Sequence, residues 1–257
     1  MKENIKKILK VTGVWNLLAK GYFTLVWWDA RKFAPIFGEN RFVAKYRHKS
    51  KKYKDLSHSQ YGQELYIYEN IFHEMKKGTF VEIGGNDPIV LSNSYTFEKL
   101  GWTGLSFEPI DELRQKWQGL RKTKCYPYLI GDKEGYVEFE EKSGDLSVMS
   151  SVVGYGRDNS EYKIVKKEMR KLENVLSENK INSVDILFVD VEGFEMNVIK
   201  GIDFNKVSIT CICVENPCFT KEGKMLRKFL CDKGYLLKAH IGSDDIFVLA
   251  NTINIKK

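Results

Sequence analysis

Two acidic residues follow an apolar run at a point where they could do chemistry. Asp190 and Glu192 come directly after the apolar run 184–189, and both project from the same face if the chain stays extended there. One carboxylate could take a proton from a substrate hydroxyl, or the pair could bind a divalent cation with it. The alternative is a solvated corner between a strand and a helix that Glu195 caps.

A glycine pair and a second carboxylate follow two other apolar runs. Glu82 precedes Gly84-Gly85-Asn86, where the missing Cβ atoms let the backbone approach a ligand closely. The GxGxxG spacing of a dinucleotide site is absent. Glu108 follows Glu82 by 26 residues and is placed to accept hydrogen bonds from both hydroxyls of a ribose.

Two more side chains are candidates that have an equally ordinary structural role. Asp132, after another apolar run, could accept a hydrogen bond from the amino group of adenine, or it could simply begin a turn. His240, late in the chain, is a candidate base beside Asp190, although a structural histidine is the more frequent case.

Alternating apolar runs and amphipathic segments predict the elements that must position these residues. The order predicts an α/β fold with a mostly parallel sheet, right-handed crossovers and an antiparallel C-terminal hairpin. Ligands bind such sheets at the carboxyl ends of the strands, where the acidic residues lie. The expected strands are 79–83, 103–108, 124–129, 184–189, 209–215, 235–239 and 245–249, and the expected helices are 64–76, 92–100, 110–120, 162–179, 197–202 and 221–233.

Composition places this sheet in a folded chain with a basic N-terminal arm. The 257 residues are 43% hydrophobic and contain 5 Pro and 5 Cys, which excludes disordered, collagen-like and disulfide-scaffold classes. An odd cysteine number without a CxxC pair favours a reducing, cytoplasmic location. Residues 1–58 carry 14 basic and 4 acidic side chains, against 27 and 30 in the rest, so the arm predicts an anionic partner.

The start of the arm has the pattern of a basic amphipathic helix. Apolar residues recur at three- and four-residue steps and form one side of a helical projection. Another side of the projection carries Lys2, Lys6, Lys7 and Lys10. Because Lys20 interrupts the apolar run that follows, we expect the helix to lie on the inner face of a membrane and not to span it. Docking on the main domain or on a second subunit is the alternative. The basic run 46–54 then indicates a solvated linker or a phosphate-facing patch.

Six short motifs follow one another along residues 59–249. They are Ser59-Gln60-Tyr61-Gly62-Gln63-Glu64, Phe80-Val81-Glu82-Ile83-Gly84-Gly85-Asn86-Asp87, Ser92-Asn93-Ser94-Tyr95 with Glu98, Gly101-Trp102-Thr103-Gly104 with Glu108-Pro109, Gly131-Asp132-Lys133-Glu134-Gly135, and Asp190-Val191-Glu192-Gly193-Phe194-Glu195 before Gly201. In this order they resemble the motifs of the FkbM-type S-adenosylmethionine-dependent methyltransferases. The resemblance excludes the arm, so residues 59–257 are expected to form the methyltransferase domain.

This resemblance implies a Rossmann-like class I methyltransferase fold with a seven-stranded sheet. It also implies S-adenosylmethionine as cofactor and O-methylation of natural products and sugars. Combined with a membrane-surface arm, it suggests an acceptor hydroxyl on a lipid-linked or polymeric glycan. Asp190 and Glu192 are then the expected catalytic pair or metal ligands. Pro88 departs from the family pattern, which usually has glycine there, but proline is tolerated in a first helical turn. The cofactor-binding residues implied are Glu82, Gly84, Gly85, Asn86, Asn93, Glu108, Asp132 and Asp190.

Other functions remain open at this stage. The basic arm and Glu215-Asn216-Pro217-Cys218 allow nucleic-acid methylation, but such motifs normally follow the strand that here ends at Asp190. A glycan- or membrane-binding adaptor would follow if Pro88 disabled the cofactor loop. A NAD-dependent dehydrogenase has little support, and a homo-oligomer is compatible with the sequence. The serine-rich stretch 143–155 is either a substrate lid or a long loop.

Overall fold

The computed structural model describes residues 42–43, 46, 49–156, 162–216 and 220–252. The contacts divide the chain into two units, Met1–Ala44 and Lys45–Lys257. In the first unit only the short strand β1 (Phe42–Val43) is described, so the predicted amphipathic helix lies outside the described residues. Among the described helices, none is long and apolar enough to cross a membrane.

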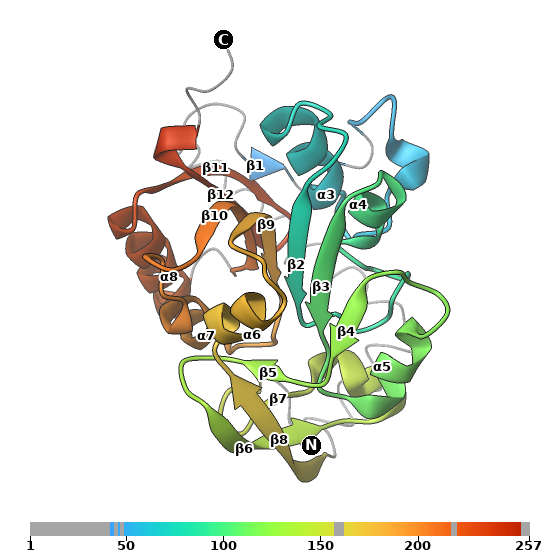
Figure 1. Ribbon diagram of the computed structural model, residues 1–257, viewed down its shortest axis with the longest axis vertical. Coiled ribbons are helices and arrows are strands. Elements are labelled where there is room, and N and C mark those ends of the chain that lie inside the picture. Colours follow the sequence, from blue (N-terminus) through green and yellow to red (C-terminus); the bar gives the residue numbers. More distant parts are fainter. Residues whose placement is uncertain (1–41, 44–45, 47–48, 157–161, 217–219, 253–257) are drawn as a thin grey trace, which may run out of the picture. The chain divides into compact units, whose positions relative to one another are not determined.

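The second unit is built on the predicted mostly parallel sheet. Strands β10, β9, β2, β3 and β4 run parallel in that order (Figure 1). Next to β10, β12 lies between β10 and β11 and pairs antiparallel with both. The seven-stranded Rossmann-like prediction is therefore confirmed. The bounds are Thr79–Ile83 for β2, Thr103–Phe107 for β3, Lys124–Tyr126 for β4, Ser183–Val189 for β9, Ser208–Glu215 for β10, Tyr235–Ile241 for β11 and Asp244–Leu249 for β12.

Helices cover both faces of this sheet, which explains why apolar residues predominate on both faces of its central strands. On one face, α6, α7 and α8 pack with alternate residues such as Val81 and Leu187 in the main core. On the other face, Phe97 of α4 packs against Phe188 and Trp102. The helices are α3 (Gln63–Tyr66), α4 (Tyr95–Lys99), α5 (Asp111–Trp117), α6 (Leu172–Glu178), α7 (Glu195–Gly201) and α8 (Lys221–Asp232).

A second, four-stranded sheet was not predicted from the sequence. Its order is β5-β8-β6-β7, with β6 antiparallel to both β8 and β7. The predicted strand 124–129 is wrong in extent, because it is divided into β4 and β5, which lie in different sheets. The bounds are Leu129–Ile130 for β5, Gly135–Glu141 for β6, Ser151–Val152 for β7 and Lys163–Arg170 for β8.

The predicted helix 162–179 is also wrong in its first half, which forms β8, whereas α6 forms the second half. Lys, Glu, Met and Arg favour helices in isolation, so this segment reads as helical by propensity. Pairing with β6 overrides that preference, because it brings Val165 opposite Phe139 and places Met169 in the core. The predicted helix 64–76 is shorter than expected, since α3 continues into a single π-helical turn, Ile67–Ile71.

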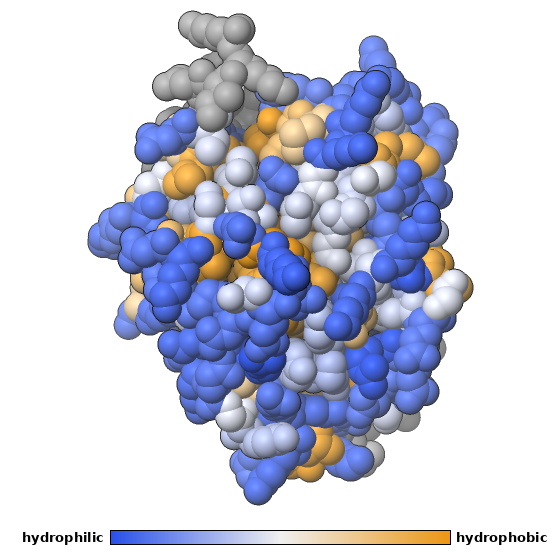
Figure 2. All heavy atoms as spheres, viewed as in Figure 1, coloured by the Kyte–Doolittle hydropathy of each residue, from blue (hydrophilic) through white to orange (hydrophobic). Residues whose placement is uncertain are grey.

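The basic run 46–54 belongs to the second unit, and several of its described residues contact other residues of that unit. The Tyr46 hydroxyl and the Ser50 hydroxyl both donate to the carboxylate of Glu69, at 2.8 and 2.6 Å. Lys52 pairs with Glu74 at the surface. These described residues therefore pack on the body and do not form a free linker. On the face shown in Figure 2, hydrophilic side chains cover most of the surface, with hydrophobic residues in small separate patches.

Candidate active site

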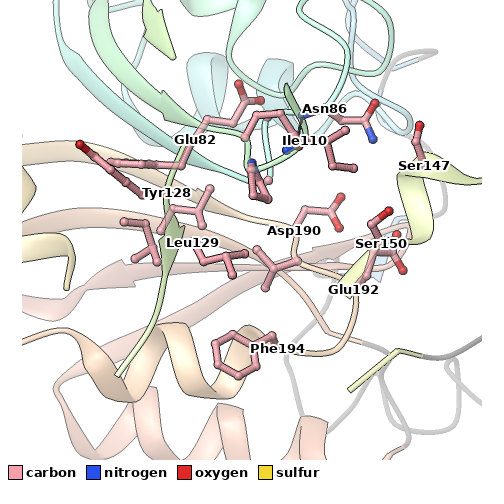
Figure 3. Close-up of a pocket in the computed structure, with 18 of the residues that line it drawn as sticks. Glu82, Asn86, Ile110, Tyr128, Leu129, Ser147, Ser150, Asp190, Glu192 and Phe194 are labelled. Atoms are coloured by element: carbon pink, nitrogen blue, oxygen red, sulfur yellow. Dashed lines mark hydrogen bonds between the residues drawn. The ribbon is translucent and has the colours of Figure 1, made fainter. Parts of the chain in front are cut away.

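A cleft of about 290 Å³ opens at the carboxyl ends of β2, β3 and β9. The ends of these neighbouring parallel strands bring together residues that are far apart in the sequence, as the motif positions predict. Figure 3 shows Asp190 near Ser150 and Glu192, while Tyr128 and Leu129 lie toward the other side of the pocket. Most of the predicted cofactor residues line this cleft, namely Glu82, Gly84, Gly85, Asn86, Asn93, Glu108 and Asp190.

The glycine pair allows the strand ends to approach one another. Gly84 has a φ of +86°, and a Cβ atom there would overlap the carbonyl oxygen of Asp190. The backbone N–H of Asp190 donates to the Ile83 carbonyl at 3.0 Å, and the N–H of Gly84 donates to the Phe107 carbonyl at 3.1 Å. Only glycine fits this position, because it must adopt a left-handed conformation beside another backbone.

Glu108 lies at the end of β3 with its carboxylate turned toward the glycine loop. It is 4% exposed, and its two oxygens accept from the N–H groups of Asn86 and Ile110 at 2.8 and 2.7 Å. Burial raises the pKa of Glu108 to about 7, although these two N–H groups oppose the shift. Each carboxylate oxygen has a further lone pair, so Glu108 could still accept hydrogen bonds from a pair of hydroxyls.

Pro88 fits its position in the loop that follows the glycine pair. The Asp87 side chain accepts from the N–H groups of Ile89 and Val90 at 3.0 and 2.8 Å, which caps the turn that begins at Pro88. The missing N–H of proline is therefore not required there. Asn86, just before, has a φ of +41°, and its carbonyl accepts from the Trp117 indole at 2.9 Å.

Arg121 supports this loop from behind and was missed by the sequence analysis. Its fully buried guanidinium donates to the Pro88 carbonyl at 2.6 Å, to the Ser94 hydroxyl at 2.9 Å and to Glu98 at 2.9 Å. It also lies 4.5 Å from the ring centroid of Trp117. An arginine that follows a helix in a polar stretch carries no local signal for such a role.

Glu82 lines the cleft, but its carboxylate is largely engaged within the protein. It accepts from the N–H groups of Asn93 and Ser94 at 3.0 and 3.2 Å and from the Ser94 hydroxyl at 2.6 Å. Burial raises its pKa, while Arg121 and these hydrogen bonds oppose the shift. Glu82 therefore fixes the chain at Asn93, and its predicted contact with a ligand stays a prediction.

Asp190 and Glu192 are brought to the same end of the cleft. The Asp190 residue is exposed to the cleft. Desolvation by the surrounding protein, followed by the charges of Glu215, Asp244, Glu192 and Glu195, raises the pKa of Asp190 well above its ordinary value. A carboxylate with a raised pKa is a better proton acceptor for a hydroxyl.

The loop between Asp190 and α7 is held by Glu195. Its side chain accepts from the N–H groups of Val191 and Gly193 at 3.3 and 2.9 Å. Glu192, between them, has a φ of +53°. The N-cap of α7 is Phe194, which makes no side-chain cap hydrogen bond, so Glu195 shapes the loop that presents Glu192 to the cleft and does not cap the helix as predicted.

The opposite part of the cleft is apolar, and the unpredicted second sheet contributes to it. Ile110, Tyr128 and Leu129 line it together with Phe139 of β6 and Val152 of β7. Ser147 and Ser150, from the stretch 143–155, line the cleft as well. The stretch is thus a 3₁₀ helix and a short strand at the cleft wall, and not a long irregular loop.

Two predicted site residues lie elsewhere. Asp132 is exposed and does not line the cleft. His240 is 4% exposed on β11, where its Nδ1 lies 2.7 Å from Asp245. Burial would raise the pKa of Asp245, but hydrogen bonds from His240 and Arg227 hold it below its ordinary value. The structure therefore places His240 in a buried ionic network that joins the hairpin to α8.

A second cavity of about 440 Å³ lies at the ends of β10, α7 and α8. The loop after Asp190 serves both cavities, since Glu192 and Phe194 line the first, whereas Gly193 and Glu195 line the second. Carboxylates, amides and an aromatic ring line it, including Glu215, Asn216 and Tyr155. Within the described ranges, no group of three or more His, Cys, Asp and Glu side chains is placed to hold a metal ion.

Comparison with known families gives one match. The family model described as Methyltransferase FkbM domain matches residues 82–237, which is more than half of the chain. The matched part begins at Glu82 and includes Glu108 and Asp190, but neither the Ser59–Gln63 segment nor β12. No curated protein matches the chain.

Proposed function

Because this chain belongs to the FkbM methyltransferase family, we propose that it transfers the methyl group of S-adenosylmethionine to a hydroxyl of a sugar or glycan. The observation that carries the proposal is a single cleft with Gly84, Glu108 and Asp190 at the ends of three adjacent parallel strands. A nucleoside site and a proton acceptor thus share one cavity, as methyl transfer to an alcohol requires.

The cleft has complementary groups for each part of S-adenosylmethionine. Tyr128 and Leu129 offer an apolar surface to adenine, and Glu108 offers two carboxylate oxygens to the ribose hydroxyls. Asp190 and Glu192 offer negative charge to the sulfonium. Asp132, named in the sequence analysis for the adenine amino group, is outside this set.

When bound, S-adenosylmethionine supplies a methyl group that is already activated by its positive sulfur. The remaining task of the protein is to orient an oxygen and accept its proton. Asp190 is the proposed base, because it is exposed to the cleft and its pKa is raised by desolvation and by the neighbouring carboxylates. Glu192 lines the same end and would orient the acceptor. Alternatively, Asp190 and Glu192 bind a divalent cation together with the substrate hydroxyl. Methyl transfer measured with and without EDTA tests this alternative.

Asp190→Asn is expected to lower methyl transfer by roughly 100-fold, the lower end of the range for loss of a general base. The assay is transfer of a labelled methyl group from S-adenosylmethionine to a panel of methyl glycosides and oligosaccharides. Asp132→Asn is the matched control, since Asp132 is exposed and outside the cleft. Equal activity of the two variants would exclude Asp190 as base. Binding of saccharides without any transfer would favour the adaptor function.

Cofactor affinity should depend on pH through Glu108. The ionised carboxylate accepts from hydroxyls, and its pKa in the empty protein is about 7. Affinity for S-adenosylhomocysteine, which has no sulfonium charge, should therefore rise with pH and level off above pH 7. Below pH 7 it should fall by up to about tenfold per pH unit. Calorimetric titrations from pH 5.5 to 8.5 measure this, and Glu108→Gln should remove the slope. A slope that persists in Glu108→Gln would assign it to another group.

The second cavity supports a saccharide acceptor. Glu215 and Asn197 are planar polar groups suited to hydroxyls, and Tyr155 provides an aromatic ring. The adjoining positions 217–219, which include Pro217 and Cys218 of the alternative nucleic-acid motif, lie outside the described residues. Cys218→Ser is expected to retain methyl transfer to the saccharide panel. Loss of all transfer in that variant would favour nucleic acid.

We also propose that the arm binds an anionic membrane surface and keeps the enzyme at the cytoplasmic face. The charge of residues 1–58 supports this. In the full-length chain, replacing Lys2, Lys6, Lys7 and Lys10 with Glu should abolish sedimentation with phosphatidylserine vesicles. S-adenosylhomocysteine binding should not change. Equal sedimentation of variant and wild type would contradict the proposal.

A further inference from the structure

Gln63 is held by hydrogen bonds on both sides of its amide at the edge of the cleft. The residue is 3% exposed at the start of α3. Its Nε2 donates to Asn93 Oδ1 at 2.8 Å and to Asp244 Oδ2 at 2.6 Å. Its Oε1 accepts from the Tyr61 backbone N–H at 3.0 Å. Both amide hydrogens of Gln63 are therefore used, and its oxygen has a backbone donor.

The backbone contact fixes the orientation of both amides. A backbone N–H can only donate, so the atom of Gln63 that faces Tyr61 must be the oxygen. The Gln63 nitrogen then faces Asn93, and the atom of Asn93 that it meets must be an acceptor. Asn93 is therefore held with its oxygen toward Gln63 and its amide nitrogen turned away.

The Asn93 amide nitrogen is available to a ligand. Asn93 lines the cleft, and its Nδ2 makes no hydrogen bond within the part of the chain that the structure describes. Its backbone is fixed at the same time, because its N–H donates to Glu82 at 3.0 Å. The side chain thus presents the two N–H groups of its Nδ2 to the cleft, while the backbone of the same residue is held in place.

A donor of this kind matters because the cleft is poor in positive charge. Among the described residues that line it there is no Lys and no Arg, while Glu82, Glu108, Asp190 and Glu192 are all acidic. A ligand carboxylate must therefore be bound by neutral N–H groups, away from Asp190 and Glu192. Asn93 satisfies that requirement.

We propose that Gln63 is a positioning residue that turns the Asn93 amide nitrogen into the cleft, where it binds the carboxylate of the amino-acid part of the methyl donor. The inference rests on the proposed function. Gln63 and Asp244 both lie outside the region matched by the family model, so this interaction joins two flanking segments to the donor site. The Ser59–Gln63 segment is itself fastened by Glu64, which accepts from the Ser57 and Ser59 hydroxyls.

The test compares two ligands that share an adenosine but differ in the carboxylate. Full-length wild type, Gln63→Glu, Gln63→Met and Asn93→Asp are titrated with S-adenosylhomocysteine and with 5′-methylthioadenosine, which has no amino-acid part. Glutamate at position 63 cannot donate to Asn93, so the Asn93 amide should rotate and present its oxygen to the ligand. Asn93→Asp keeps the hydrogen bond from Gln63 but places a carboxylate in the cleft. This variant provides an independent test if Gln63→Glu fails to fold.

Gln63→Glu and Asn93→Asp should each lower the affinity for S-adenosylhomocysteine at least tenfold. The affinity for 5′-methylthioadenosine should change less than twofold in both variants. Gln63→Met, which removes the constraint without inverting the amide, should have a smaller effect on the first ligand only. Equal losses for both ligands would reduce Gln63 to a structural role, and no loss for either would also overturn the inference. If wild type bound neither ligand, the proposed function itself would fail.

Discussion

Replacing Gly84 with alanine should lower the free energy of unfolding by about 4 kcal/mol or more, as measured by urea denaturation. Alanine at a φ of +86° costs about 1 kcal/mol. The new Cβ would also overlap the Asp190 carbonyl oxygen, and overpacking in rigid surroundings costs about 1 to 3 kcal/mol or more. The upper end applies because backbone hydrogen bonds hold both segments, from Asp190 to Ile83 and from Gly84 to Phe107.

Gly119→Ala separates the two contributions. Gly119 also has a positive φ, +79°, but no atom would lie within 4 Å of its Cβ. This variant should therefore lose only about 1 kcal/mol. Equal losses for the two variants would mean that the ends of β2 and β9 can separate freely. The close approach at Gly84 would then not define the cleft.

Glu108→Ala should weaken S-adenosylmethionine binding by at least about 100-fold. Hydrogen bonds to a charged acceptor contribute about 1.5 to 3 kcal/mol each, and the variant would lose two to the ribose. It would also release the Asn86 and Ile110 N–H groups, which Glu108 now holds. Calorimetric titration at pH 8 measures the effect, because Glu108 is ionised there.

The matched control is Glu112→Ala, an exposed acid on the nearby helix α5. It should bind S-adenosylmethionine like the wild type. Both variants should show cooperative unfolding, which separates a lost contact from a lost fold. Retained affinity in folded Glu108→Ala would show that Glu108 does not contact the ribose.

The sequence was sufficient to place the main sheet and most of the cleft. Apolar strands buried on both faces have a strong signal, and parallel order brings their carboxyl ends together. Glu108 and Asp190 could therefore be located before any contact was known. The glycine at position 84 was also informative, since close backbone approach is the usual reason for glycine after a strand.

Interactions between distant segments could not be predicted in this way. Lys163–Arg170 has helical propensity and becomes β8 only because β6 pairs with it. Arg121 has no local pattern, and the motif that contains Gln63 does not reveal its partners, which lie in other elements. His240 was a reasonable candidate by residue type, but the sequence does not reveal that Asp245 is its buried neighbour.

The most direct test of the account is calorimetric titration of the full-length protein with S-adenosylmethionine at pH 8. We predict one saturable site with a micromolar dissociation constant. A cooperatively folded protein that gives no saturable heat at millimolar S-adenosylmethionine would contradict the assignment of the cleft as a methyl-donor site.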